Sequence, residues 1–194
     1  MSALRPRSAR LAGASLVEMV VAVAVLGIVA LIAVPRADPV ASFAADAAAG
    51  DIANALRFAQ QEAIRTGRYH IVRIDPATQA LSVTALTTVG AVGTDAAFRV
   101  LHPVERRDYL LNFTNNGSAS STIVGSWFQY AGGGASANFA SFGPDGVPAS
   151  VSGVWTNRVP SVRNLLLLPG VVTLRHGQAE RQVRLDRVTG RVTY

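Results

Sequence analysis

The pattern of hydrophobic residues changes twice along this chain, and each change predicts a different kind of structure. From Ala14 to Val34 only Ser15 and Glu18 interrupt an apolar run of 21 residues. Such a run forms a helix about 30 Å long, which matches the hydrocarbon core of a bilayer. Three arginines, Arg5, Arg7 and Arg10, precede the run, and no arginine lies inside it. This asymmetry predicts a cytoplasmic N-terminus, with the rest of the chain on the other side of the membrane.

A second helix is predicted between Val40 and Thr66, because apolar residues recur there at intervals of three to five positions. Gly67 is a typical residue for its C-terminal end. The core-facing stripe is predicted to contain Phe43, Ala47, Ile52, Leu56, Ala59 and Ala63. The polar residues that fall largely away from this stripe are Arg57, Gln60, Gln61 and Arg65. Glu62 and Arg65 are spaced for an ion pair on the helix surface.

After Gly67 the period becomes two, which predicts β-strands. Residues 69–74 and 81–86 alternate around a turn at 75–78 and predict a hairpin. Further short strands are predicted at 98–101, 109–113, 127–130, 138–142, 171–175, 181–185 and 191–194. Gly143-Pro144-Asp145-Gly146 predicts a tight turn, and residues 147–160 have the composition of turns. The sequence therefore predicts a long helix followed by about eight short strands.

Glu18 is the anomaly in the apolar run. A carboxylate in a membrane-spanning helix costs about 3 kcal/mol on insertion scales, so it is rarely found without a partner. Cleavage after Gly13 would create a new α-amino group at Ala14, one helical turn before Glu18. The ammonium group of the same or a neighbouring subunit would then give the carboxylate a partner.

The segment Gly13-Ala14-Ser15-Leu16-Val17-Glu18 resembles the class III signal of type IV pilins and type II secretion pseudopilins. The resemblance implies that a prepilin peptidase cleaves between Gly13 and Ala14 and methylates the amino group of Ala14. It also implies that Glu18 directs fibre assembly by neutralising the N-terminal amine of the adjacent subunit. The family usually has Phe where this chain has Ala14. Pro35 falls where the family often has a proline that kinks the helix.

Two other interpretations of this N-terminus remain open. One is an ordinary secretory signal peptide cleaved near Ala33, although an h-region usually has 7–15 residues and no Glu. The other is a plain membrane anchor with an unpaired glutamate at position 18.

Three later segments resemble one branch of the same family, the GspH and FimT/FimU minor pseudopilins and pilins. They are Ala55–Gly67, Phe142–Gly146 and Thr189–Val192. The resemblance implies an α+β, pilin-like fold in which a long N-terminal helix, with a membrane-spanning first half, packs on an antiparallel β domain. The implied organisation is a leader at 1–13, a transmembrane and fibre-core helix at 14–35, its amphipathic second half at 36–67, and a periplasmic β domain at 68–194. The implied location is the bacterial inner membrane, and the implied partners are other pilins or pseudopilins and the prepilin peptidase.

Charge is concentrated at the C-terminal end, where residues 158–194 contain seven arginines and two acidic residues. A dense arginine patch attracts phosphate, but such charges are also common on the solvated face of a sheet. FimT proteins are implicated in DNA uptake through a basic C-terminal segment, so the resemblance gives four DNA-binding candidates, Arg181, Arg184, Arg187 and Arg191. Arg181 and Arg187 share a strand face only if no turn intervenes. Val192-Thr193 stands where the DNA-binding form has a second arginine.

Residues for catalysis or cofactor binding do not stand out. The chain has no cysteine, and its three histidines, His70, His102 and His176, lack the spacing of metal ligands. Asp145 fits a turn better than a Ca²⁺ loop. We therefore predict a non-enzymatic protein without a metal or cofactor, a minor pseudopilin or minor pilin. The sequence does not distinguish secretion from pilus systems, and DNA binding is the alternative function.

Overall fold

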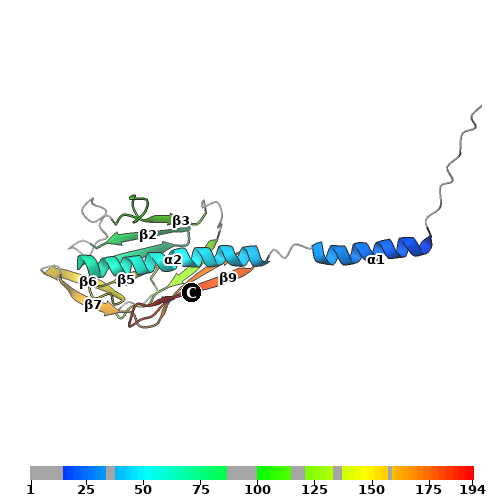
Figure 1. The fold of residues 1–194 in the computed structure, drawn as a ribbon. Helices are drawn as coiled ribbons and strands as arrows, with labels where there is room; N and C mark the ends of the chain where they lie inside the picture. The colour runs from blue at the N-terminus through cyan, green and yellow to red at the C-terminus, as the bar shows by residue number, and fades with distance from the viewer. Residues whose placement is uncertain (1–14, 34–37, 87–99, 115–120, 133–136, 157–158) are drawn as a thin grey trace, which may run out of the picture. The chain divides into compact units, whose positions relative to one another are not determined.

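The computed structural model describes residues 15–33, 38–86, 100–114, 121–132, 137–156 and 159–194. The chain divides into two compact units, Met1–Ala37 and Asp38–Tyr194. In the first unit, the described residues form helix α1, Leu16–Ala33. The second unit contains helix α2, Asp38–Thr66, and ten strands among its described residues (Figure 1). The α+β class is thus confirmed, with more strands than the eight or so that the sequence indicates.

Helix α2 begins and ends with the expected local signals. Pro39 stands at the second position of the helix, where its missing N–H group costs little. At the other end, Gly67 has a φ of +65°, in the left-handed region that commonly terminates helices. The predicted ion pair between Glu62 and Arg65 is present, and the predicted end of the helix is confirmed.

The predicted core stripe of α2 is wrong in its first half. Phe43 is 74% exposed and Ala47 is also exposed, whereas Ala44, Ala45, Ala48 and Ala49 are buried. One residue is about 100° of rotation in a helix, so the true stripe turns away from Phe43. Ile52, Leu56, Ala59 and Ala63 are buried as predicted. The buried alanines allow the strands to approach the helix closely.

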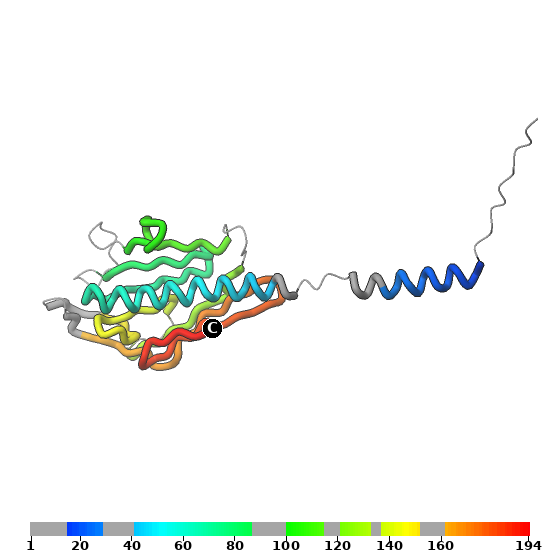
Figure 2. The backbone as a smooth tube through the Cα atoms, viewed as in Figure 1, coloured from blue at the N-terminus to red at the C-terminus, as the bar shows by residue number. Residues whose placement is uncertain are grey.

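Two four-stranded antiparallel sheets pack against α2 (Figure 1). The first has the order β3-β2-β1-β5 and consists of β1 His70–Asp75, β2 Ala80–Ala85, β3 Leu110–Asn112 and β5 Phe139–Phe142. The second has the order β10-β9-β8-β4 and consists of β4 Thr122–Trp127, β8 Gly170–His176, β9 Ala179–Leu185 and β10 Val192–Thr193. The C-terminal strands, coloured orange to red in Figure 2, run beside α2. The core therefore lies between one helix and the inner faces of both sheets.

The β1–β2 hairpin and the C-terminal β8–β9 hairpin agree with the sequence prediction. Residues 147–160 do not: β6 Ala149–Thr156 and β7 Val159–Leu165 pair as a separate two-stranded sheet. The prediction of a strand at 127–130 is also wrong, because β4 ends at Trp127, and Phe128 and Tyr130 form only isolated bridges. Of the strand predicted at 98–101, residues 98 and 99 lie outside the described residues, and Leu101 forms an isolated bridge. Whether these segments form strands depends on the segments with which they pair, and local composition does not show which segments those are.

Among the residues that the structure describes, none of the helices combines the length and the apolarity needed to cross a membrane.

Candidate functional site

Glu18, for which the sequence resemblance implies a role in assembly, lies in the first turn of α1. Its side chain is exposed, and the turn is closed by a hydrogen bond from Met19 N to Ser15 O at 3.1 Å. A carboxylate in the first turn is favoured by the helix dipole. Gly13 and Ala14, the predicted cleavage and methylation positions, lie outside the described residues.

Between Leu16 and Ile28, helix α1 presents exposed apolar side chains around its circumference. Nine large apolar residues between Leu16 and Ile28 are 53–80% exposed. A helix that is apolar all round is normally covered by lipid or by other protein. The described side chains of α1 therefore combine one carboxylate, that of Glu18, with an exposed apolar surface.

Gln60 of α2 joins two turns that are far apart in the sequence. Its Nε2 atom donates to Gly146 O at 2.9 Å and to Thr189 O at 3.0 Å. Gly146 ends the predicted tight turn, which is closed by a hydrogen bond from Gly146 N to Gly143 O at 2.8 Å. The three segments that resemble the GspH and FimT/FimU branch therefore meet at one side chain. The prediction that Gln60 points away from the packed face is wrong.

The C-terminal residues are held to α2 one turn earlier in the helix. The Arg57 guanidinium donates to Val192 O at 3.1 Å and lies 5.8 Å from the centre of the Tyr194 ring. Arg57 is therefore a structural contact for β10, contrary to its predicted place on the free side of the helix. The periodicity of α2 indicates that Arg57 is not a core residue, but it does not indicate that the C-terminal residues pack against Arg57.

Arg181 also has a structural role. It lies on the same face of β9 as the buried Val183 and Leu185, and it forms an ion pair with Asp46 of α2. A second guanidinium nitrogen donates to Ser42 Oγ at 2.6 Å. The hydrogen bond to Asp46 raises the pKa of the Arg181 guanidinium. Arg181 is bound to two residues of α2, so it is no longer one of the exposed candidates for DNA binding.

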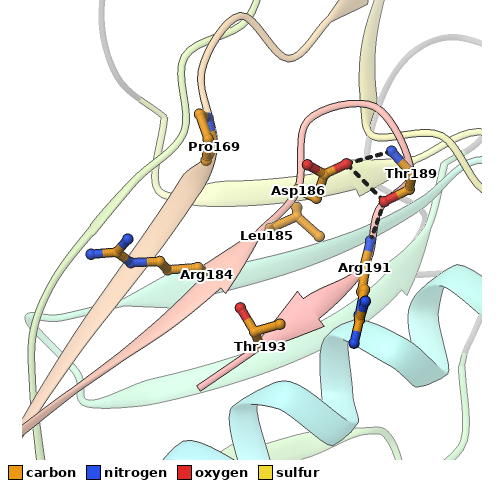
Figure 3. Close-up of a pocket in the computed structure, with 7 residues that line it drawn as sticks. All are labelled: Pro169, Arg184, Leu185, Asp186, Thr189, Arg191 and Thr193. Carbon is orange, nitrogen blue, oxygen red and sulfur yellow. Dashed lines mark hydrogen bonds between the residues drawn. The ribbon is translucent and has the colours of Figure 1, made fainter.

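The other three candidate arginines lie on or near the outer surface of the second sheet. Arg184 and Arg191 line an open hollow of about 570 Å³ beside Asp186 and Thr189 (Figure 3). Arg187 donates to Leu167 O at 3.2 Å. A turn follows β9, so Arg181 and Arg187 do not share a strand face, and only part of the predicted arginine set forms one surface.

Asp186 shapes the turn that carries Arg187. Its Oδ1 accepts hydrogen bonds from the Thr189 amide at 2.7 Å, the Thr189 hydroxyl at 2.7 Å and the Val188 amide at 3.1 Å. These bonds, together with the charge of Arg187, hold the pKa of Asp186 below its ordinary value. The carboxylate is therefore occupied within the turn (Figure 3).

The remaining polar candidates also have structural positions. Asp145 pairs with Arg163 at 2.6 Å and accepts from Val147 N at 3.2 Å, within its predicted turn. Burial is the largest single influence and acts to raise the pKa of Asp145, but the hydrogen bonds from Arg163 and Val147 and the charge of Arg163 together outweigh it, so the pKa is lowered. His70 is buried, and its Nδ1 lies 3.1 Å from Arg68 O. Within the described part of the chain, no group of three or more metal-ligating side chains comes together.

Comparison with known proteins finds similar solved structures. No family model matches the chain, and no curated protein does. Two solved structures of the minor pseudopilin EpsH from the type 2 secretion system of Vibrio cholerae are similar to it. One is 16% identical with a TM-score of 0.42, covering 77% of this chain and 94% of the EpsH chain. The other is 17% identical with a TM-score of 0.42, covering 78% and 93% respectively.

Proposed function

We propose that this chain is a minor pseudopilin or minor pilin, a structural subunit of a short helical fibre that starts from the bacterial inner membrane. The observation that carries the proposal is the segment Gly13–Glu18 directly before an apolar helix, with Glu18 in the first helical turn. In this proposal residues 14–35 anchor the chain, the N-terminus is cytoplasmic, and residues 68–194 are periplasmic.

Glu18 would specify how subunits stack. The apolar helix remains in apolar surroundings when it moves from lipid into a bundle of neighbouring helices, so this exchange costs little. A buried carboxylate without a partner is costly, whereas one beside an ammonium group is stabilised. The α-amino group of Ala14 on an adjacent subunit supplies that ammonium only when the two helices are correctly staggered. The proposed register therefore depends on one charge pair.

The mature N-terminus tests this proposal. Full-length protein expressed with a prepilin peptidase should yield, by intact mass and terminal peptide sequencing, a chain that begins at N-methylated Ala14. Co-expression with a catalytically inactive peptidase is the control and should leave the leader attached. A terminus at or beyond residue 34 would identify a secretory signal peptide, and an intact Met1 with active peptidase would contradict processing altogether.

DNA uptake is the alternative function, supported by the position of Arg184 and Arg191 around one hollow. Three exposed arginines would contact phosphates in this case, because Arg181 is paired with Asp46. Binding carried by phosphate contacts weakens steeply with salt. A gel-shift titration of the full chain over a range of salt concentrations tests it, and absence of a shift even at low salt removes the alternative.

A further inference from the structure

We propose that the second sheet docks a protein partner whose surface carries carboxylates next to apolar side chains. The docking surface, named here the basic–apolar face, consists of Trp127, Leu167, Leu168, Arg184, Arg187 and Arg191. This proposal is independent of fibre assembly and of the N-terminal processing.

Strand register places the centre of the basic–apolar face. Val171 of β8 is the neighbour of Arg184 in β9 on one side and of Trp127 in β4 on the other. Residues directly opposite in adjacent strands point to the same side of a sheet. Here that side is the outer one, because Val172 and Val183 point into the core. Trp127 is 40% exposed, so an aromatic ring and a guanidinium flank the same apolar residue.

The loop between β7 and β8 extends this surface. Leu167 and Leu168 are 43% and 47% exposed. The backbone at Leu167 is fixed on both sides, because its amide donates to Gln129 O at 2.8 Å and its carbonyl accepts from Arg187 at 3.2 Å. Two leucines and an arginine are thus presented together next to the sheet.

The position of Gly170 adds rigidity to the loop. A Cβ atom at Gly170 would clash with the ring of Phe128, which is fully buried. The chain at the start of β8 therefore lies directly on a core aromatic side chain. A surface fixed in this way loses little conformational entropy when a partner binds.

The charge of the basic–apolar face is unbalanced. Arg163, Arg175 and Arg181 each form an ion pair with an acidic side chain. None of Arg184, Arg187 and Arg191 forms a salt bridge with another residue that the structure describes. Asp186 lies beside them and interacts with the charge of Arg187, but its single negative charge offsets only one of the three arginines. Arginine is enriched at the energetic centres of protein interfaces, together with Trp. The complementary surface is one that supplies carboxylates.

The face lies at the end of its unit remote from the start of α2. The β8–β9 turn is close to that start, since a Cβ atom at Gly177 would lie 3.8 Å from that of Ala41. The opposite ends of these strands lie near Gln60, which contacts Thr189 just after β9. The basic–apolar face therefore lies at the end of this unit that is opposite the start of α2.

A protein fits this surface better than a nucleic acid does. Three arginines give a slope of log affinity against log salt of about −3, which is small for a protein that binds DNA through phosphates. The exposed Leu167 and Leu168 side chains contribute nothing to phosphate contacts. An acidic and apolar protein surface can contact both the arginines and the apolar side chains of the basic–apolar face.

Fluorescence anisotropy with the full chain in detergent micelles tests the proposal. The probes are short labelled peptides of equal length in which Leu alternates with Asp or with Asn, and a labelled oligothymidine. The double variant Arg184→Ala/Arg187→Ala removes the charge, and Leu168→Ser reduces the apolar part. Arg73→Ala is the matched control, because Arg73 is an exposed arginine on the first sheet.

We expect the Asp/Leu peptide to bind at physiological salt and the Asn/Leu peptide to bind at least about tenfold more weakly, because charge-assisted contacts are lost. The double variant should bind the Asp/Leu peptide more weakly by a similar factor, and Leu168→Ser should bind it several-fold more weakly. Arg73→Ala should bind it with the affinity of the unmodified chain. Absence of Asp/Leu binding, equal binding of the two peptides, or an unchanged affinity in the double variant overturns the proposal. Tighter binding of oligothymidine than of the Asp/Leu peptide does so too, in favour of a nucleic-acid surface.

Discussion

The Nε2 atom of Gln60 lies 2.9 Å from the carbonyl oxygen of Gly146, a residue 86 positions further along the chain. The same atom lies 3.0 Å from the carbonyl oxygen of Thr189. One side-chain amide of α2 therefore holds a turn from each of two distant parts of the β domain. Gly190 completes the contact, because its φ is +69° and a Cβ atom there would lie 2.9 Å from Gly146 O and clash with Gln60.

Replacement of Gln60 by Ala should destabilise the protein. The part-buried carbonyl group of Gly146 and the exposed carbonyl group of Thr189 both lose their donor. A buried unsatisfied group costs about 1–3 kcal/mol, and the cost is less where water replaces the lost bond. We expect a loss of about 1–3 kcal/mol in the free energy of unfolding, measured by urea denaturation in detergent. Gln61→Ala is the control, since Gln61 is exposed on the next helical position, and should change stability by less than about 0.5 kcal/mol. Equal effects of the two substitutions would contradict the role of Gln60.

Replacement of Gly170 by Ala should destabilise the sheet for a steric reason. The added methyl group meets the ring of Phe128, which has no free space to enter because it is fully buried. Overpacking of this kind costs about 1–3 kcal/mol. The measurement is the thermal midpoint by circular dichroism. Gly125→Ala, where a Cβ atom meets nothing within 4 Å, is the matched control. A Gly170 variant as stable as the Gly125 variant would show that Phe128 moves aside freely.

Acidification should destabilise the protein through His70. Burial lowers the pKa of His70, so the unfolded chain binds a proton at a higher pH than the folded one does. Stability is then full above the ordinary histidine pKa of about 6.5 and falls as the pH decreases below it. One such group changes the free energy of unfolding by at most about 1.4 kcal/mol per pH unit.

Urea denaturation at a series of pH values between neutral and mildly acidic measures this effect. His70→Gln should flatten the dependence in that range. An unchanged slope in the His70 variant would assign the pH dependence to other groups.

Substitution of Glu18 by Ala tests the assembly part of the proposed function. We expect the variant to insert into the membrane as the unmodified chain does, since an apolar residue replaces a costly charge. Its co-purification with the other subunits of the fibre should be lost, because the partner of the N-terminal ammonium group is missing. Glu18→Asp, which retains the charge, is the control and should retain part of the incorporation. Co-purification of the Ala variant at the unmodified level would remove Glu18 from assembly.

The sequence by itself determined the elements whose signals are local. Gly67 predicts that helix α2 ends at Thr66, and alternation around a turn predicts the β1–β2 hairpin, as the structure has them. The tight turn at Gly143–Gly146 followed from its own residues. Backbone preference and side-chain period act within a few residues, so each can be inferred without knowledge of the rest of the chain.

Only the tertiary structure decided which polar residues are in contact and which apolar residues are exposed. The sequence resemblance makes Arg181 a candidate for binding DNA, yet it pairs with Asp46, which lies 135 positions earlier. Phe43 was expected in the core, yet it is exposed, and the strands β6 and β7 form where composition indicated turns. Periodicity fixes the angles of side chains around an element but not what packs against each face. That depends on contacts between segments distant in sequence, whose hydrogen bonds and buried surface outweigh local preference.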